Sequence, residues 1–358
     1  MDLKQIKEYC DAAAPAGFEK EAYDVMKTHI QAYSDDLSQD KLGSLIALKK
    51  SNVDSAPKVM LAGHLDEIGF IITKIDDNGF LKFQPLGGWW SQVMLSQKME
   101  VVNSKKERFI AVIGSKPPHS LTPEEVSKPM KMDAMYLDLG VGSKEEVEKL
   151  GINIGDFVVP HCEFTQMANK KYLLAKAWDN RIGCYIVGEV FKRINGKNLE
   201  VDIYGVGTVQ EEVGCRGAKT TANMINPDLG ISIDVGLAGD CPGNESDTFQ
   251  SKLGGGPLIT LYDSGMIGHR GLRDYIVNIA KKSNIDFQFS GLNGGSTDGS
   301  AIHVAHDGSP TLYIGLATRY IHSNVGIIHY DDIESTIDLL VQFILKLNKE
   351  SVSEITYK

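Results

Sequence analysis

Five ionisable residues stand at or just beyond the ends of four apolar, β-branched runs of this 358-residue chain. They are His64, Glu211, Glu212, Asp234 and His322. Such runs predict buried central strands, and the ligands of α/β sheets bind beyond the carboxyl ends of those strands. Charged side chains are rarely buried without a partner, and a metal ion supplies a strong counter-charge to several of them at once. The spacing therefore predicts a metal centre at one edge of a sheet.

These residue types suit two divalent ions that share a bridging carboxylate and take two further ligands each. Asp179, in the motif KAWDNR, is assigned as the bridge. One ion is assigned His64 and Asp234, and the other Glu212 and His322. Three carboxylates leave a net charge of about +1 on two dications, which a bridging hydroxide brings close to neutrality. Oxygen and imidazole ligands suit zinc or cobalt, with manganese as a further candidate.

Two further acidic residues complete the predicted chemistry. Neighbouring residues of a strand point to opposite faces, so Glu211 and Glu212 cannot both bind one ion unless the chain turns there. We therefore predict that Glu212 binds metal and that Glu211 is the general base, which takes the proton of a metal-bound water. Asp66 lies two residues beyond His64, on the same side of an extended strand. It is predicted to accept the free ring N–H of His64 and to orient that ring.

The elements that position these residues follow an α/β pattern. Helical spacing near the N-terminus precedes the run that ends at His64, and strand and helix patterns alternate from Asp179 to about residue 348. We predict a mixed, mostly parallel sheet flanked by helices, of the zinc-peptidase type. Residues 1–68 and 162–358 would form this discontinuous catalytic domain.

Residues 69–161 interrupt that pattern with short β-type runs separated by turn signals, and they predict a small all-β, barrel-like domain. They offer no ionisable residue at a comparable strand end, so we expect assembly rather than chemistry from them. An apolar stretch in this segment would form an exposed patch unless a partner covered it, and such patches mark interfaces. The stretch comprises Gly87, Gly88, Trp89, Trp90, Val93, Met94 and Leu95.

Composition limits the classes of partner. A net charge of −10 and a pI near 5.4 argue against nucleic acid and anionic membranes, which both favour a basic surface. The five cysteines are scattered and include no CxxC pair, so neither a disulfide framework nor a thiolate zinc site is indicated. No signal peptide or long apolar stretch is apparent, and a cytoplasmic location is expected.

Six motifs follow one another along the chain: GHLDEIGF, KAWDNRIGC, VQEEVGCRGA, LGISIDVG, GGSTDGSAIH and RYIHS. In order and spacing they resemble the TET-type dinuclear aminopeptidases, the family of bacterial glutamyl aminopeptidase and of archaeal deblocking and leucyl enzymes. The resemblance spans essentially the whole chain. It implies the same ligands, base and orienting residue that are assigned above. It also implies that the inserted domain drives dimerisation and that dimers assemble into a hollow tetrahedral dodecamer.

We therefore expect an aminopeptidase that removes N-terminal residues from peptides by attack of a metal-bridging hydroxide on the first carbonyl. A broad or leucine-type preference is favoured, and a glutamyl preference is the alternative, with Arg319 or Lys252 as the basic group that it would need. A carboxypeptidase or deacylase on the same fold is a rival enzyme. A glycosidase needs two free carboxyl groups, which a metal cluster does not leave. A non-catalytic scaffold stabilised by metal is the alternative of another class.

Three histidines are rival ligands, namely His303, His306 and His329. The first falls in a predicted helix and the others in polar turns, so they are not assigned to the metal centre. The segment GGSTDGS at 294–300 is predicted to shape the substrate cleft. Cys215 and Cys241 are expected to be small buried residues rather than nucleophiles.

Overall fold

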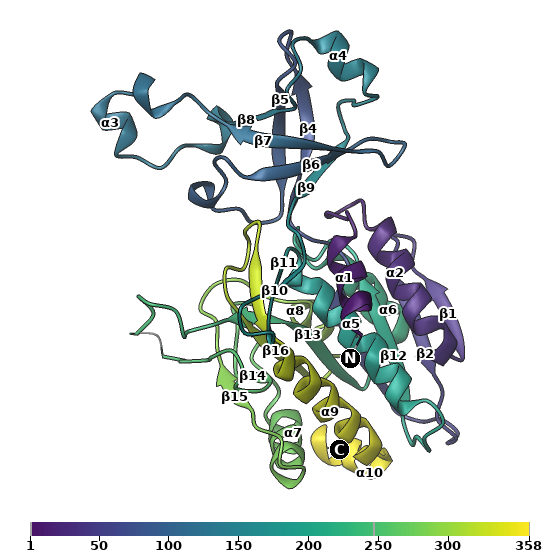
Figure 1. Cartoon of the computed structure of the whole chain (residues 1–358). Helices are drawn as coiled ribbons and strands as arrows, with labels where there is room; N and C mark the ends of the chain where they lie inside the picture. The colour runs from purple at the N-terminus through teal and green to yellow at the C-terminus, as the bar shows by residue number, and fades with distance from the viewer. Residues whose placement is uncertain (1, 246–247, 358) are drawn as a thin grey trace.

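The computed structural model describes residues 2–245 and 248–357, which form an α/β layer and a barrel above it (Figure 1). Within those residues the main sheet has eight strands, whose spatial order is β1 (Asp36–Gln39), β2 (Leu45–Lys49), β12 (Asp202–Thr208), β3 (Lys58–His64), β13 (Leu229–Leu237), β16 (Thr311–Thr318), β14 (Leu258–Thr260) and β15 (Gln288–Ser290). The central strands β12, β3, β13 and β16 are parallel, and the pairs β1-β2, β2-β12 and β16-β14 are antiparallel. This mixed sheet confirms the predicted α/β class.

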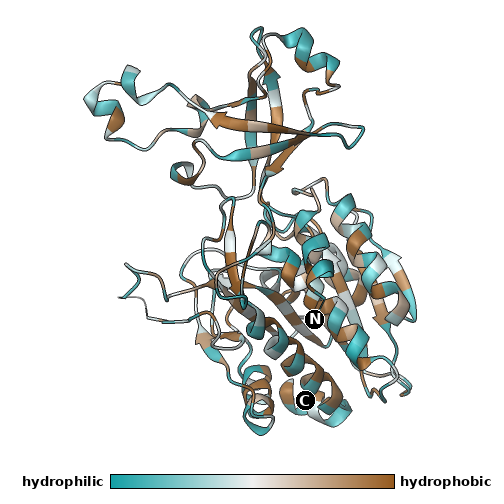
Figure 2. Ribbon diagram, viewed as in Figure 1, coloured by the Kyte–Doolittle hydropathy of each residue, from teal (hydrophilic) through white to brown (hydrophobic). Residues whose placement is uncertain are grey.

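Helices cover both faces of the sheet. One face carries α2 (Lys20–Ile30), α5 (Trp178–Ile194), α7 (Arg270–Lys282) and α9 (Tyr330–Lys346), with α1 (Leu3–Asp11) packed on α5 and α10 (Lys349–Ile355) packed on α7. The other face carries α6 (Arg216–Ile225) and α8 (Gly299–Ile302). Hydrophilic residues lie on the outward faces of these helices (Figure 2).

The central strands are apolar along their whole length because both of their faces are buried. In β3, Val59 and Leu61 join the core under α5, whereas Met60 and Ala62 join the core under α6. This alternation follows from the two-residue repeat of a strand. The burial on both sides also explains why an ionisable residue at the end of such a strand is conspicuous in the sequence.

Residues 69–160, which follow β3, form the upper part of the molecule in Figure 1. Its strands close into a barrel in the order β4 (Gly69–Ile75), β5 (Leu81–Leu86), β8 (Tyr136–Asp138), β7 (Arg108–Gly114), β6 (Lys98–Val102) and β9 (Phe157–Pro160). Short helices, α3 (Pro123–Val126) and α4 (Lys144–Lys149), lie in its connections, so the segment is not purely β. Single 3-10 turns occur at Gln31–Tyr33, Ser91–Val93, Pro118–Ser120 and Met132–Ala134.

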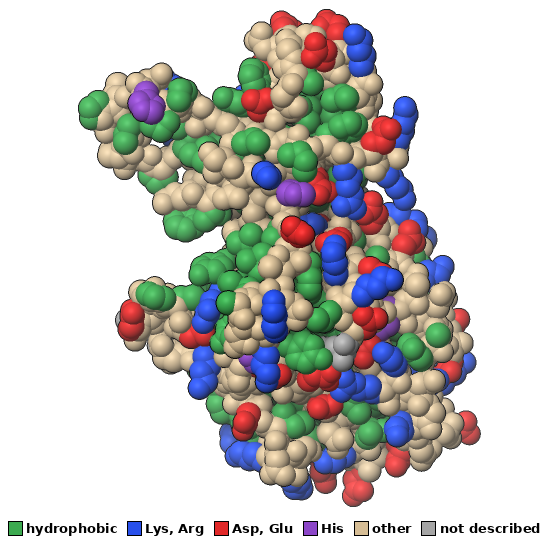
Figure 3. Space-filling model, in the orientation of Figure 1, with side chains coloured by type: hydrophobic (Ala, Val, Ile, Leu, Met, Phe, Trp, Pro, Cys, Tyr) green, Lys and Arg blue, Asp and Glu red, His purple; other side chains and the backbone are tan. Residues whose placement is uncertain are grey.

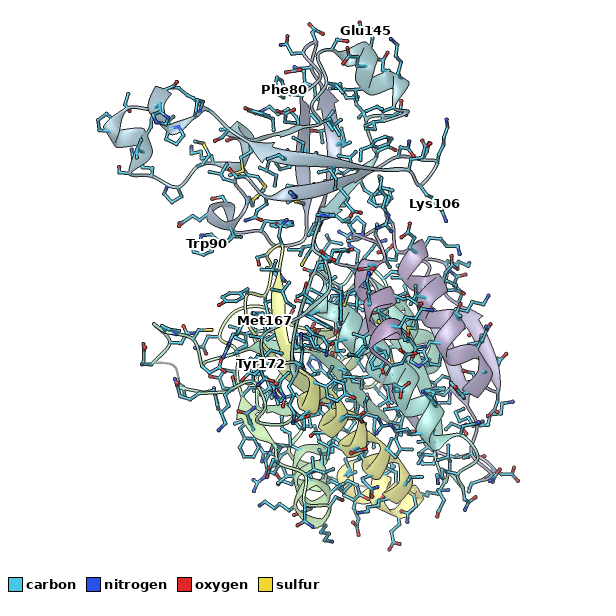
Figure 4. The ribbon with its side chains drawn as sticks, in the orientation of Figure 1. Phe80, Trp90, Lys106, Glu145, Met167 and Tyr172 are labelled. Carbon is cyan, nitrogen blue, oxygen red and sulfur yellow. The ribbon has the colours of Figure 1, made fainter. Side chains whose placement is uncertain are left out.

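The apolar stretch predicted to be an exposed patch is divided by the fold: Met94 joins the barrel core, Trp89 and Leu95 pack partly buried against that core, and Gly88 and Trp90 are exposed. Met94 is fully buried, because a 3-10 turn at Ser91–Val93 directs the following residue into the barrel core. Trp89 stacks on Phe70 with ring centroids 4.7 Å apart. Trp90 is 60% exposed, and it lies on the lower rim of the barrel, facing the α/β layer (Figure 4).

A small antiparallel sheet, which the sequence patterns do not predict, lies beside the barrel junction. It consists of β10 (Thr165–Gln166), β11 (Tyr172–Ala175) and β17 (Gly326–His329). Apolar side chains gather around the indentation between the barrel and the α/β layer in Figure 3. In the described parts of the chain, we find no helix whose length and apolarity would let it cross a membrane.

Polar contacts fix the barrel on the α/β layer. Arg108 of β7 donates hydrogen bonds to the Glu21 carboxylate of α2 at 2.6 Å and to the carbonyl of Asp11 at 3.1 Å. Asn324, which is buried, donates to the carbonyl of Lys98 in β6 at 2.8 Å. The two parts therefore meet through hydrogen bonds on both sides of the junction.

Candidate metal centre

The parallel strands β3 and β13 bring two of the predicted ligands together. His64 is the last residue of β3, as the sequence predicts. Asp234 lies within β13 rather than at its end. Because Ser232 pairs with Ala62, Asp234 is level with His64, and 3.8 Å separates His64 Nε2 from Asp234 Oδ2.

Glu211 and Glu212 lie in a turn after β12, and both side chains reach the same site. Gln210 has a left-handed backbone, with φ of 57°, which ends the extended conformation. The turn removes the strand alternation that would send the two side chains to opposite faces. Glu211 Oε2 lies 3.8 Å from His64 Nε2.

Asp66 connects His64 to this turn. Its carboxylate accepts hydrogen bonds from the N–H groups of Glu211 and Glu212, at 3.0 and 3.1 Å. His64 Nδ1 lies 3.1 Å from the carbonyl oxygen of Asp66 and 3.5 Å from its Oδ1. The backbone carbonyl of Asp66 is therefore the nearer acceptor for the ring N–H. Its carboxylate holds the turn that carries Glu211 and Glu212. Both contacts direct His64 Nε2 toward the acidic residues.

Asp179 lies between the two predicted histidine ligands. Its Oδ1 is 2.9 Å from His64 Nε2, and its Oδ2 is 3.4 Å from His322 Nε2. The residue stands in the first turn of α5, where Asn180 Oδ1 accepts the N–H of Gly183 at 3.0 Å and so caps the regular helix. A carboxylate that faces one histidine with each oxygen has the arrangement expected of a ligand shared by two metal ions.

His322 approaches from a loop and not from a strand end. The strand β16 ends at Thr318, and His322 follows four residues later with a left-handed φ of 58°. Its Nε2 lies 3.5 Å from Glu212 Oε2. All five predicted ligands therefore meet in one place, with Asp66 and Glu211 beside them.

The charge of this cluster is not balanced by basic side chains. Burial raises the pKa values of Glu211, Glu212 and Asp234 well above the usual range. Burial raises the pKa of Asp179 too, but the neighbouring His322 and His64 outweigh it and lower that pKa. Among ion pairs of the described residues, none joins a lysine or arginine to these four carboxylates.

Two buried atoms in the cluster lack hydrogen-bond partners, and the donor set fits divalent metal. These atoms are His64 Nε2, whose 2.9 Å contact with Asp179 lacks hydrogen-bond geometry, and Glu212 Oε1. Ligand atoms within 4.8 Å of one another form two groups that contain His64, namely His64–Glu211–Asp234 and His64–Asp179–Glu212. Each group combines imidazole with carboxylates, the donors that zinc, cobalt and manganese accept.

Asp298 is an acidic neighbour of the metal centre. The sequence shows it only as part of the GGSTDGS segment and does not predict that it lies beside this centre. It is buried, and the Thr208 hydroxyl donates a hydrogen bond to its carboxylate. Burial raises the pKa of Asp298 to about 6. The Asp298 carboxylate lies close to the carboxylate of Glu211 and to the thiol of Cys215. Sequence periodicity offers no signal for this contact, because residues about 90 positions apart meet only in the fold.

A buried basic network stands directly behind the metal centre and was also not predicted. Lys176 Nζ donates to both oxygens of Glu67, at 2.6 and 2.7 Å. Arg181 donates to Glu67 at 3.0 Å and to four backbone carbonyls, those of Tyr9, Ala12, Ala14 and Leu65. A signal was available, since Glu67 follows Asp66 and Arg181 lies two residues after Asp179.

The rival histidines make other contacts. His303 Nδ1 bonds with the carbonyl of Gly299, His306 Nε2 with that of Asn223, and His329 Nδ1 accepts the N–H of Asp331 at the start of α9. Cys215 is buried, whereas Cys241 is only partly buried.

A small pocket opens beside Asp179, Glu212 and His322, and apolar residues dominate its remaining walls. These residues include Ile68, Trp178, Ile321 and Val325. None of the described residues that line it is a lysine or an arginine. Arg319, which the sequence offers for acidic substrates, is engaged by Asp240 at 2.9 and 2.7 Å.

The chain is similar to known aminopeptidases along most of its length. Residues 43–339 match the family model described as M42 glutamyl aminopeptidase. Glutamyl aminopeptidase of Lactococcus lactis is 33% identical over 98% of this chain and 98% of its own length. A TET aminopeptidase from a marine sediment archaeon of the Thaumarchaeota superposes with a TM-score of 0.95, at 38% identity, covering 99% of this chain and 98% of that one.

A third similar protein is the TET1 peptidase of Pyrococcus horikoshii, which can assemble into a tetrahedron or a large octahedral shell. It has a TM-score of 0.86 and 31% identity, over 96% of this chain and 99% of its own.

Proposed function

This chain belongs to the M42 glutamyl aminopeptidase family and is an aminopeptidase, and on that premise we propose how its residues hydrolyse peptides. The substrate is a peptide with a free N-terminus. The observation that carries the proposal is the Asp179 carboxylate, which faces one histidine with each oxygen inside a cluster of uncompensated carboxylates. A non-catalytic scaffold would not need the further acid, Glu211, beside that cluster.

We assign Asp179 as the shared ligand of two divalent ions, zinc or cobalt before manganese. His64 and Asp234 would hold one ion, and Glu212 and His322 the other. When bound, the ions would neutralise the carboxylates, polarise the scissile carbonyl and lower the pKa of the attacking water, so that hydroxide becomes the nucleophile.

The chain's own residues perform the proton transfers in this proposal. Glu211, which is partly buried and has its Oε2 3.8 Å from His64 Nε2, takes the proton of the attacking water and later gives one to the leaving amine. Asp66 is a positioning residue, because it holds both His64 Nδ1 and the backbone of the Glu211–Glu212 turn. One residue, Asp66, thus fixes the ligand through its backbone carbonyl and the base through its carboxylate.

The pocket beside Glu212 supports a broad or leucine-type preference. An acidic side chain would have to be buried against Ile68, Trp178 and Ile321 without a basic partner, which is costly. Arg319 is held by Asp240, and Lys252 is exposed. These contacts weigh against the glutamyl alternative.

We also propose the division of the chain into a catalytic domain, residues 1–68 and 162–358, and an inserted dimerisation domain, residues 69–161. Barrel strands from Gly69 to Pro160 support this division. By analogy with the TET1 peptidase, the chain would form dimers that assemble into a tetrahedral dodecamer. A cytoplasmic location is part of the proposal and does not rest on that analogy. Light scattering of the purified protein tests the assembly, since a monomer of 39.2 kDa would contradict it.

The test of the activity uses metal-stripped protein to which zinc, cobalt or manganese is returned. Leucyl, alanyl, glutamyl and lysyl chromogenic amides are compared with N-acetyl-leucyl amide as the matched control. We expect kcat/KM for the leucyl substrate to exceed that for the glutamyl substrate by about tenfold or more, because an unpaired carboxylate is costly to bury. The acetylated substrate should not be cleaved.

The other outcomes identify the rivals. Equal cleavage of the acetylated substrate would support a deacylase or carboxypeptidase. Preference for glutamate would support the glutamyl alternative. Metal binding without cleavage of any substrate would support the scaffold.

A further inference from the structure

A loop of the barrel lies against two of the proposed metal ligands. Gly87 and Gly88 follow β5 directly. A Cβ atom placed on Gly87 would lie 3.0 Å from Glu212 Oε2, and one placed on Gly88 would lie 3.2 Å from His322 Nδ1. Both distances are shorter than ordinary van der Waals contact. The barrel therefore approaches these ligands with backbone alone.

The two glycines differ in what a side chain would disturb. Gly87 has φ of 89°, a region that favours glycine, and its Cβ would also lie 2.7 Å from Ile68 Cγ2. Gly88 lacks a positive φ, and the only contacts within reach of its Cβ are with the His322 ring. Substitution of Gly88 thus perturbs the ligand with little cost to the backbone.

The two histidines of the centre are supported in different ways. His64 is buried, and Asp66 from its own α/β layer holds its Nδ1. The His322 side chain is 39% exposed and stands on a loop.

The loop that carries His322 is attached to the barrel at a second point. Asn324, only two residues further on, is buried and donates to the Lys98 carbonyl of β6 at 2.8 Å. Contacts with Gly88 and with Lys98 thus bracket His322. The orientation of this histidine depends on where the barrel sits.

We propose that the Gly87–Gly88 segment is a positioning element for the ion held by Glu212 and His322, so that the barrel takes part in building the metal centre. The inference rests on the ligand assignment of the proposed function. It revises the expectation that the inserted segment serves assembly alone. Groups that orient metal ligands typically change metal affinity by about 10–100-fold when they are altered.

The experiment compares Gly88→Ala with Gly142→Ala, a barrel glycine whose Cβ would meet nothing closer than 3.9 Å. Metal affinities of both sites are measured by competition with a chromogenic chelator, and the melting temperature of the metal-free protein is recorded. The variant His322→Gln identifies which of the two measured affinities belongs to the ion held by Glu212 and His322. Asn324→Ala is a second variant that loosens the same loop without entering the site.

We expect Gly88→Ala to weaken by about 10–100-fold the same site that His322→Gln weakens, leaving the other site and the metal-free melting temperature unchanged. Asn324→Ala should weaken that site by a smaller factor, and Gly142→Ala should change neither. Wild-type affinities in both Gly88→Ala and Asn324→Ala would overturn the positioning role while leaving the ligand assignment intact. Unchanged metal binding in His322→Gln would overturn the ligand assignment, and with it this inference. Equal weakening of both sites in Gly88→Ala would also count against it.

Discussion

The α/β layer contains two neighbouring clusters of buried ionisable residues, and they treat charge in opposite ways. Asp66 belongs to the metal centre, and the next residue, Glu67, belongs to the network of Lys176 and Arg181. Along α5, Asp179 faces the metal centre, and Arg181, two residues later, faces the network. Sequence neighbours are thus divided between two sites by the direction in which each side chain points.

In the network, every strong donor has an acceptor. Arg181 uses its guanidinium for five hydrogen bonds, and Lys176 adds three more. In the metal centre, carboxylates crowd around His64, and the buried Glu212 Oε1 has no partner. A buried cluster that satisfies itself supports the fold, whereas one that leaves charge unbalanced requires a ligand. Whether buried ionisable side chains satisfy one another therefore separates a structural cluster from a ligand-binding one more reliably than burial does.

The largest effect should come from removing the base while keeping its shape. Glu211→Gln is expected to lower kcat by about 10²–10⁴-fold, because the amide cannot accept a proton. Metal content should stay at the wild-type level, measured by elemental analysis. His64→Ala is the contrasting variant, which should lose metal. Near wild-type turnover in Glu211→Gln would remove Glu211 from the proton-transfer step.

The next effect concerns the network. Arg181→Met should lower the free energy of unfolding by about 3–5 kcal/mol, because it leaves buried carbonyls and Glu67 without a donor. Arg193→Met is the matched control on the same helix, where the ion pairs with Glu334 and Asp338 are partly exposed. That change should cost only about 0–1 kcal/mol.

Denaturant unfolding of metal-free protein measures both changes. If the two arginine variants lost equal stability, the buried network would have no special structural role. A stable Arg181→Met variant with reduced metal affinity would instead assign the network to the metal centre.

A smaller effect is expected from pH. Burial raises the pKa values of Glu211, Glu212 and Asp234, so the folded metal-free protein retains protons that the unfolded chain releases above about pH 4. The pKa of His64 is raised as well, because nearby carboxylates outweigh burial, and its contribution is lost as pH rises through that pKa. Both shifts make the metal-free protein less stable as pH rises. Each group whose pKa is raised lowers the free energy of unfolding by about 1.4 kcal/mol for each pH unit between its pKa in the unfolded chain and its pKa in the folded protein.

Metal should reverse this trend, since its ligands bind in their deprotonated forms and its affinity increases with pH. The lowered pKa of Asp179 acts below its ordinary value of 3.8 and does not affect this range. Thermal unfolding between about pH 5 and pH 8, with and without chelator, checks both trends. A metal-free protein that is more stable at the higher pH would contradict the charge imbalance proposed for the cluster.

Sequence patterns predicted the cluster of acidic residues and histidines better than its surroundings. The ends of apolar strands indicated His64 and Asp234, because burial on both sheet faces makes an ionisable residue stand out. The fourth apolar run indicated His322 too, although this residue lies in a loop beyond β16. Turns, in contrast, have no periodicity, so the shared orientation of Glu211 and Glu212 required the structure.

Contacts between distant segments were not predictable in the same way. Asp298 and Arg181 act through partners about 90 to 170 positions away, which no local pattern connects. The apolar run around Met94 was predicted only in part, because hydrophobicity alone does not distinguish the side chains of a barrel core from those of an exposed patch. Glycines such as Gly88 carry no side chain from which a role could be read.

The order of strands in the main sheet has a consequence for synthesis on the ribosome. The central strand β3 is made early, yet its neighbours β12 and β13 follow more than 130 residues later, after the whole barrel has been translated. Barrel strands are contiguous in the chain and can close once Pro160 has emerged. Until β12 and β13 have been made, β3 exposes two unpaired edges and two apolar faces, a state prone to aggregation. The nascent chain therefore depends on late-made segments, and a truncated product would retain a barrel without its sheet.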